Sequence, residues 1–492
     1  MELIWKELDA ERLIARSVEQ VRIAGELPSP DGRRPLSIAG CTARVVIDAA
    51  VVDTGEVRLE GRILTSLTAV DENAKPFAYE SSAGFSHRVA VEGAASGMTA
   101  EVLPCIQSMT AEPSPSGAEL SAGVDIELRV ISSVPLKVTA GVSGADDLEV
   151  KTASCVHSRR QRIGQDTLRM REEIAAENVS DVISCEGQVM VRDVTAEQGT
   201  ACVSGTITVS AVTADADGRI SQLIRQVPFR ERIAVNALAD RIFCTPSLGS
   251  VYLRSLGEEF GLISMEAEVT FTLYRIGATE LELPVDIFSP GIGFDCLKEE
   301  VTLINAMGSQ SVQTNIKESV PLPDGSAEIG VPLFMTARAL ITEAVPGNDG
   351  VDVSGIITTG ITYESTAGRI YSFTEDVPFE VRLDCEARVN APKIEASCLG
   401  SITSAVERSF QVQYSLLLNA ELYDAEEQSV VVGLAESEKK ETRSGLIICF
   451  ASEGDCVFDI AKRYSVPCES VRKLNPDIGE PFSDGDKLIL LV

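Results

Sequence analysis

The chain has 492 residues, of which 44% are hydrophobic and 24% are charged, and its formal net charge is -31. This composition is typical of folded soluble domains and excludes a largely disordered chain. So acidic a surface repels phosphate backbones and anionic headgroups, which argues against nucleic acid and bare membrane as partners.

The N-terminal segment from Met1 to Arg16 reads MELIWKELDAERLIAR and predicts a short amphipathic helix. It lacks the basic start, apolar run and cleavage site of a secretory signal, and no later segment has the uncharged run that spans a bilayer. We therefore expect a cytoplasmic protein without membrane insertion. Its twelve scattered cysteines include no C-x-x-C pair, so we expect reduced, buried thiols.

A pattern of glycine, phenylalanine and arginine recurs three times along the chain. Each glycine has an apolar residue two positions before it and isoleucine two positions after it; phenylalanine follows 24 residues later, and arginine three further on. The three sets are Gly61, Phe85 and Arg88; Gly205, Phe229 and Arg232; and Gly355, Phe379 and Arg382. Three features at constant offsets predict tandem copies of one domain.

Within each copy the apolar residues alternate with polar ones, which is the pattern of strands with one buried face. The turns at 217–219 and 367–369, with 73–75 at the matching place, predict hairpins. We expect six or seven strands per copy, closed as a sandwich or barrel-like sheet. A glycine inside a strand indicates close approach of a neighbour, and the repeated phenylalanine is the candidate.

The C-terminal segment changes character. A polar linker leads to a strand at Ile448, a turn into a helix that carries Ile460, a second helix from Cys468 to Leu474, and a last strand after Gly485. The predicted fold is therefore mainly β: three tandem β-sandwich-like repeats and a small βααβ module. Their bounds are 1–140, 141–290 and 291–436 for the repeats, 437–446 for the linker and 447–492 for the module.

Five landmarks in this module, G-D at 454–455, I-A at 460–461, Tyr464, L-N-P at 474–476 and G-D-x-L-I at 485–489, resemble a LysM domain. The resemblance implies the βααβ fold and a groove between two loops that commonly binds N-acetylglucosamine glycans, including peptidoglycan. The implied binding residues are Gly454, Asp455, Cys456, Val457, Asn475, Pro476, Asp477 and Ile478.

Cysteine stands where this resemblance implies a hydroxyl or an acid at both helix starts. A thiol is a weak acceptor for free N–H groups, so Cys456 and Cys468 are expected to weaken both caps and to disfavour glycan binding. We expect Ile460 and Leu474 in the core of the module. Asn475 and Asp477 are expected in an exposed loop that tolerates substitution.

The repeats, through their V-x-G-x-I and P-F-x-x-R blocks, resemble the SPOCS domain, also called DUF3794, of endospore-forming bacteria. Tandem SPOCS domains before a LysM domain are similar to a spore coat assembly protein that binds a coat morphogenetic ATPase at the forespore surface. The resemblance implies a mother-cell protein located at the spore coat, whose LysM domain recognises protein.

Catalytic chemistry has few candidates in this chain. The two histidines, His87 and His157, have no partner at catalytic or metal-ligating spacing, and His87 is expected to be a solvated strand residue. We expect no enzyme activity, cofactor or metal. The repeated arginine fits either a carboxylate clamp or an ion pair within each copy.

Two functions fit these features. The first is a non-enzymatic scaffold of spore coat assembly that docks to the morphogenetic ATPase through the LysM-like module. The second is a peptidoglycan-binding protein of the cortex or wall. The missing signal favours the scaffold, because intact wall lies outside the membrane.

Overall fold

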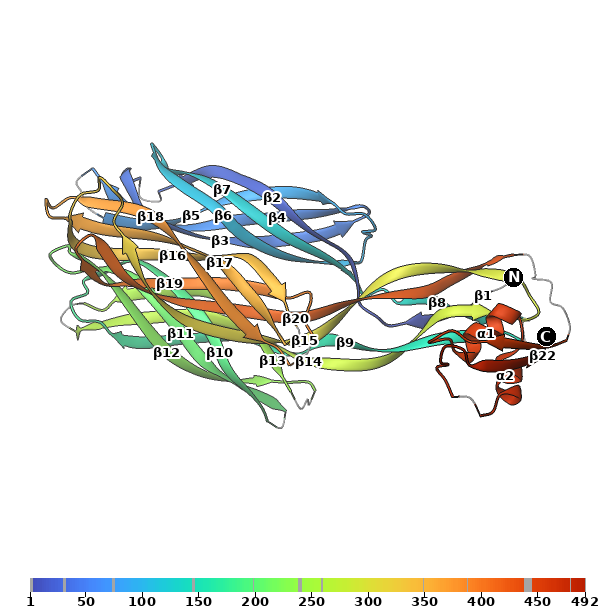
Figure 1. Ribbon diagram of the computed structural model, residues 1–492. Coiled ribbons are helices and arrows are strands. Elements are labelled where there is room, and N and C mark those ends of the chain that lie inside the picture. The colour runs from blue at the N-terminus through green and yellow to red at the C-terminus, as the bar shows by residue number, and fades with distance from the viewer. Residues whose placement is uncertain are drawn as a thin grey trace.

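The computed structural model describes residues 3–491 apart from 30–31, 73–75, 144–146, 198, 238–240, 258–259, 348, 387, 438–444 and 478. This part of the chain is mainly β, with many separate sheets and two short helices. The strands form a broad head that narrows to a slender stem, and the helices lie at the far end of the stem (Figure 1).

The first eight strands end before the second copy of the sequence pattern. They are β1 (Leu3–Leu8), β2 (Arg12–Pro28), β3 (Pro35–Asp53), β4 (Glu56–Asp71), β5 (Pro76–Ala90), β6 (Thr99–Ser114), β7 (Gly117–Ser132) and β8 (Leu136–Val142). One layer has the order β3-β4-β5, and a second has the order β2-β7-β6. Both layers contribute to one hydrophobic core, in which Leu59, Ile63 and Leu120 are fully buried.

The next twelve strands form two groups with the same pairing. The first group is β9 (Glu149–Ala175), β10 (Asp181–Glu197), β11 (Thr200–Ala214), β12 (Ile220–Ala234), β13 (Phe243–Ser255) and β14 (Leu262–Phe288). The second is β15 (Phe294–Pro321), β16 (Ile329–Pro346), β17 (Gly350–Ser365), β18 (Ile370–Asp384), β19 (Lys393–Val406) and β20 (Ser409–Glu436). Layers β10-β11-β12 and β16-β17-β18 face β9-β14-β13 and β15-β20-β19 across cores of their own.

Strand β4 shows why these segments are strands. Its side chains alternate between buried and exposed along most of its length, with Leu59 and Ile63 buried while Arg58 and Arg62 are exposed. The two-residue period matches the pleat of a sheet with one face in the core. The same alternation continues into β5, where Phe85 and His87 share the inner face with buried Val89.

The mid-strand glycines lie beside the repeated phenylalanines, which confirms the expected close approach. Each glycine is register-paired with its phenylalanine, in the order Gly61 with Phe85, Gly205 with Phe229, and Gly355 with Phe379. A Cβ atom on these glycines would lie 2.9, 2.7 and 2.5 Å from the respective rings and too close to a backbone carbonyl of the other neighbouring strand. The missing side chain therefore makes room for an aromatic ring and a close strand.

The N-terminal segment is not a helix, contrary to the sequence prediction. Leu3–Leu8 pairs antiparallel with β8, and Arg12 begins β2, which pairs with β7 along its whole length. Cross-strand hydrogen bonds and the burial of Leu8 and Ala10 outweigh the weak helical periodicity of an isolated segment.

The stem is built from three antiparallel strand pairs. They are β1 with β8, and the outer ends of β9 with β14 and of β15 with β20. Their apolar side chains meet in a separate core that includes Leu8, Leu136, Leu283, Leu303 and Val430. Each of the three strand groups therefore supplies one pair to a shared structure.

His157 lies where these pairs join the head. It is buried, its Nε2 accepts the backbone N–H of Glu11 at 2.9 Å, and its Nδ1 is 2.9 Å from Oδ1 of Asn305. Because Nε2 is an acceptor, the proton of the neutral ring is on Nδ1 and is donated to Asn305. Burial is the main cause that lowers the pKa of His157 below 6.5, while the bond to Asn305 opposes the shift.

Because of His157, the free energy of unfolding is expected to fall as the pH drops below about 6.5. This one imidazole contributes up to about 1.4 kcal/mol per pH unit. The pKa of His157 is lower in the folded state than in the unfolded chain, so as the pH falls the unfolded chain is protonated first and is favoured. Burial raises the pKa of the adjacent Glu11, and this opposes the trend at lower pH. Urea unfolding at pH 7.5 and 6.0 should show a smaller loss in His157→Gln; equal losses would contradict the assignment.

His87 corrects the expectation of a solvated residue. Its place on the inner face of β5 makes it half-buried, and its Nε2 is shielded from solvent.

The repeated arginines, in contrast, lie on the outer face. Arg382 is bonded to Asp352, its cross-strand neighbour, at 2.9 Å, and Arg88 lies 3.8 Å from Glu56. In these two copies the arginine thus makes an ion pair within its own strand group.

All twelve cysteines are free thiols, and five of them are buried while seven are half-buried.

The hairpin turns at 217–219 and 367–369 connect β11 to β12 and β17 to β18. Glycine takes positive φ at both turns, with values of 80° for Gly218 and 75° for Gly368. The matching turn at 73–75 lies outside the described residues.

Candidate functional site

The C-terminal elements follow the order strand, helix, helix, strand. They are β21 (Leu446–Phe450), α1 (Val457–Tyr464), α2 (Cys468–Leu474) and β22 (Lys487–Leu491). The helices pack on one face of the β21-β22 sheet, around Ile460, Val471, Leu488 and Leu490, each with at most 1% of its surface exposed. We call this unit, 446–491, the C-terminal module.

Leu474 is not part of this core, contrary to the sequence prediction, because 37% of its surface is exposed. Leu474 is the last residue of α2, and the buried side of this helix carries Cys468 and Val471 instead. Val471 is 1% exposed and takes the place in the core that was expected for Leu474.

The first candidate loop, 454–457, is tied down by internal hydrogen bonds. Gly454 has a φ of 83° and donates its N–H to the carbonyl of Phe482. Asp455 accepts the N–H of Ser452 at 3.0 Å and pairs with Arg463 at 2.9 Å. The carboxylate of Asp455 is thus occupied within the module.

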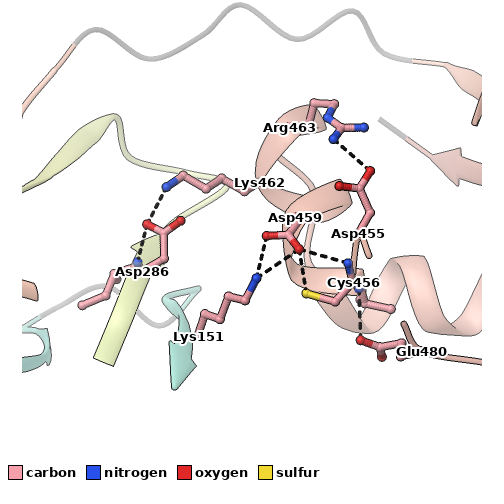
Figure 2. Close-up of polar contacts among 10 residues, drawn as sticks. Lys151, Asp286, Asp455, Cys456, Asp459, Lys462, Arg463 and Glu480 are labelled. Carbon is pink, nitrogen blue, oxygen red and sulfur yellow. Dashed lines mark hydrogen bonds and ion pairs between the residues drawn. The ribbon is translucent and has the colours of Figure 1, made fainter. Parts of the chain in front are cut away.

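Cys456 caps α1 together with Asp459, as Figure 2 shows. The backbone N–H and the thiol of Cys456 both donate to Oδ2 of Asp459, at 3.0 and 2.9 Å. The N–H of Val457 is capped from another segment, by Glu480 at 3.1 Å. The acid three residues into the helix therefore offsets the weak capping of the thiol.

Lys151 of β9 reaches the same carboxylate from the stem. Its Nζ lies 2.9 and 3.0 Å from the two oxygens of Asp459 (Figure 2). Burial works to raise the pKa of Asp459, but the bonds from Cys456 and Lys151 prevail and lower it. The loop that was expected to form one wall of a groove is thus joined through Asp459 to the stem.

Other contacts hold α1 and α2 against the stem. Lys462 pairs with Asp286 of β14 at 2.5 Å, and the rings of Phe458 and Phe288 meet edge to face with centroids 5.0 Å apart. The N–H of Cys468 donates to Glu149 of β9 at 3.0 Å. Apolar packing and charge pairing at one surface together fix the module on the end of β9 and β14.

The start of α2 also differs from the sequence prediction. Pro467 is the residue before the helix, so Cys468 is the first helical residue and not the cap. Its side chain is buried, and burial with nearby Glu149 raises the pKa of the thiol to about 12. The carboxylate of Glu149 supplies the acceptor that a hydroxyl would otherwise provide.

Asn475, the first residue of the second candidate loop, is held by hydrogen bonds within the module. Asn475 donates from Nδ2 to the carbonyls of Val471 and Ile489, at 2.7 and 2.8 Å, and its Oδ1 accepts the N–H of Ile489 at 2.7 Å. These bonds join the end of α2 to β22, so Asn475 is not a freely replaceable loop residue as expected. Pro476 and Asp477 are exposed, and Ile478 lies outside the described residues.

The two candidate loops contact different segments of the module. The first contacts Phe482 and Glu480, whereas Asn475 contacts β22. Sequence reasoning missed the stem residues Glu149 and Lys151, which are some 300 positions away and carry no local signal. The pairing of Cys456 with Asp459 had a signal, because acids often occupy the third helical position behind a cap.

The outer face of the β21-β22 sheet carries exposed apolar side chains. Register pairs Leu446 with Leu491 and Ile448 with Ile489, and Phe450 completes the set at the end of β21. Their exposed fractions are 68%, 59%, 52%, 37% and 63% in that order. We call these five residues the outer apolar face. Patches of this kind on a soluble domain mark interaction surfaces.

The chain matches no protein-family model, no curated protein and no solved structure. Within the described ranges, no helix has the length and apolar character needed to cross a membrane. No group of three or more His, Cys, Asp or Glu side chains among those residues is placed to hold a metal ion.

Proposed function

We propose that this protein is a non-enzymatic scaffold of spore coat assembly, made of three tandem SPOCS-like β-sandwich repeats and a LysM-like module. The module docks to a protein partner, the coat morphogenetic ATPase, at the forespore surface. The outer apolar face is the observation that carries this proposal, and the sequence resemblances supply the identity of the partner.

The outer apolar face has the chemistry of a protein interface. Interface cores are enriched in aromatic and large aliphatic side chains and depleted in charge. Phe450, Ile448 and Leu491 are each more than half exposed, and leaving them in water is unfavourable by about 25 cal/mol per Å² of apolar surface. A partner that covers these side chains recovers that free energy on binding.

The alternative is peptidoglycan binding by the two loops of the module. Glycan recognition needs polar groups that are free to bond hydroxyl and amide groups of a sugar. Asp455, Cys456 and Asn475 already make bonds within the protein, and Lys151 of the stem joins the first loop through Asp459. These commitments favour the protein partner over the glycan.

The histidines support the non-enzymatic part of the proposal. Both ring nitrogens of His157 are bonded to protein atoms in the interior, and His87 is half-buried on the inner face of a strand. A general base needs a nitrogen within reach of a substrate proton. Burial raises the pKa of the Cys398 and Cys244 thiols, which makes both of them poor nucleophiles.

Replacing Phe450 and Leu491 together by alanine is expected to weaken binding of the purified coat morphogenetic ATPase by at least about tenfold, since central apolar residues dominate interface energies. Both side chains are exposed, so the fold should persist. Asp477→Ala in the second loop is the matched variant and should bind the ATPase normally.

Sedimentation with purified peptidoglycan separates the two functions. The scaffold hypothesis expects no saturable sedimentation of the wild-type protein. Saturable sedimentation that Asp477→Ala abolishes, with ATPase binding unchanged in the Phe450 and Leu491 variant, would replace the scaffold by the glycan-binding function.

A further inference from the structure

A partly open cavity of about 1190 Å³ lies between the three strand groups of the head. Strands β3, β10 and β16, one from each group, supply much of its wall. The groups also touch directly around it: Thr362 donates to the carbonyl of Ala39 at 3.1 Å, and Gln222 donates to the carbonyl of Gly400 at 2.8 Å. The cavity therefore belongs to the assembled head and not to any one group.

Equivalent positions of the three groups face this cavity. Arg44, Gln188 and Arg338 stand at the same distance before the mid-strand glycine of their group, and all three line the wall. Two residues before each of these positions, Thr42, Glu186 and Thr336 also line the wall and are likewise equidistant in sequence from the glycine of their group. The cavity thus lies where three copies of one strand position converge, as on an approximate three-fold axis.

Two of the three long side chains bridge to a neighbouring group. Arg44 donates to the carbonyls of Leu248 and Gly249, at 3.1 and 2.8 Å. Gln188 donates from Nε2 to the carbonyl of Ser415 at 3.2 Å. Both contacts use neutral carbonyl oxygens, and no acid in the described part of the chain forms an ion pair with Arg44.

Arg338 occupies the third of these positions, and part of its guanidinium has no partner. Its Nε and Nη1 are shielded from solvent and make no hydrogen bond to any residue that the structure describes. Burial is the main cause that lowers its pKa, although the group remains a cation at any physiological pH. A buried cation with unfilled donors is unfavourable unless an acceptor reaches it.

Nearby carboxyl groups do not supply this acceptor. Asp376 lies close enough to act on the pKa of Arg338, yet neither Nε nor Nη1 donates to it. Glu186 interacts with Thr42, and burial raises its pKa, which favours the uncharged acid. Cys41 and Cys105 lie near Arg338, but burial raises the pKa of both thiols and keeps them neutral. Nε and Nη1 of Arg338 are therefore unfilled donors in this wall.

We propose that this cavity binds a small organic anion through a carboxylate or phosphate group that accepts from Arg338. Ligand pockets commonly measure about 300–1,000 Å³, so the space is ample for such a molecule together with water. The orphaned Oε1 of Gln188, on the same wall, adds an acceptor for a donor group of the ligand. The site is independent of the C-terminal module and of its partner.

The test uses the full-length protein with two probes, inorganic phosphate and citrate, against sodium chloride at matched ionic strength. We expect at least one probe to bind saturably by calorimetry and to raise the melting temperature. Arg338→Met should weaken that binding by about 10- to 100-fold, as loss of a charge-assisted hydrogen bond does. Exposed Arg171→Gln, on an outer position of β9, should bind like the wild type.

The identity of the responding probe distinguishes phosphate from carboxylate chemistry. No saturable binding of either probe, or equal binding by Arg338→Met, overturns the proposal. Stability without ligand gives a second measurement, because Met fills a similar volume without an unfilled charge. Arg338→Met should then melt at or above the wild-type temperature, and a markedly lower value would show that Arg338 is held by the protein itself.

Discussion

Gly205→Val is expected to destabilise the second strand group by about 3 kcal/mol or more, at the upper end of overpacking in a core. The new Cβ would clash with the carbonyl oxygen of Met190 on one side and would lie 2.7 Å from the ring of Phe229 on the other. Neither obstacle is the free end of a flexible side chain. Thermal unfolding by circular dichroism, with hydrogen exchange of residues 181–234, measures the effect.

Gly84→Val is the matched control. Gly84 lies in β5, and only the carbonyl oxygen of Gly61, at 3.9 Å, comes within contact of an added Cβ. Valine is favourable in strands, so this variant should melt within about 0.5 kcal/mol of the wild type. If the two variants are equally stable, the close packing of Phe229 over Gly205 is wrong.

Val471→Asp is expected to unfold the C-terminal module while the head stays folded. Val471 is 1% exposed against Ile460 and β22, and an unpaired carboxylate there costs about 3 kcal/mol or more. A core of so few residues cannot absorb this cost. Hydrogen exchange should show loss of protection across 446–491 and unchanged protection in strands such as β11.

Leu474→Asp, three residues further along the same helix, provides the comparison. With 37% of its surface exposed, Leu474 can place a carboxylate in water, so the module should remain folded. Unfolding by Leu474→Asp with little effect of Val471→Asp would reverse the assignment of the core. Loss of head protection in Val471→Asp would instead show that the module supports the stem.

The mainly β fold and the place of the repeated glycines could be predicted because their signals are local. A two-residue period marks a strand from its own sequence, and constant offsets between Gly205 and Phe229 or Gly355 and Phe379 place each pair on adjacent strands. The alternation also determines which face His87 occupies, although its sequence neighbours alone suggested solvent.

The contacts between distant segments could not be predicted in the same way. Lys151 and Asp459 meet across the stem, and Arg44 reaches Gly249 in another strand group, yet nothing in either local sequence indicates the partner. The N-terminal helix failed for a related reason, since its strand partner β8 lies far along the chain. In the module, helical spacing alone did not tell Val471 from Leu474.

The ends of each strand group lie side by side at the tip of the stem. Leu3 pairs with Val142, Glu149 with Phe288, and Phe294 with Glu436, so the chain leaves every group where it entered. Gene duplication therefore needs no rerouting of the backbone, because a new copy can be inserted between two others through a short connection. A copy inserted in this way would begin and end at the tip of the stem, as the three present copies do.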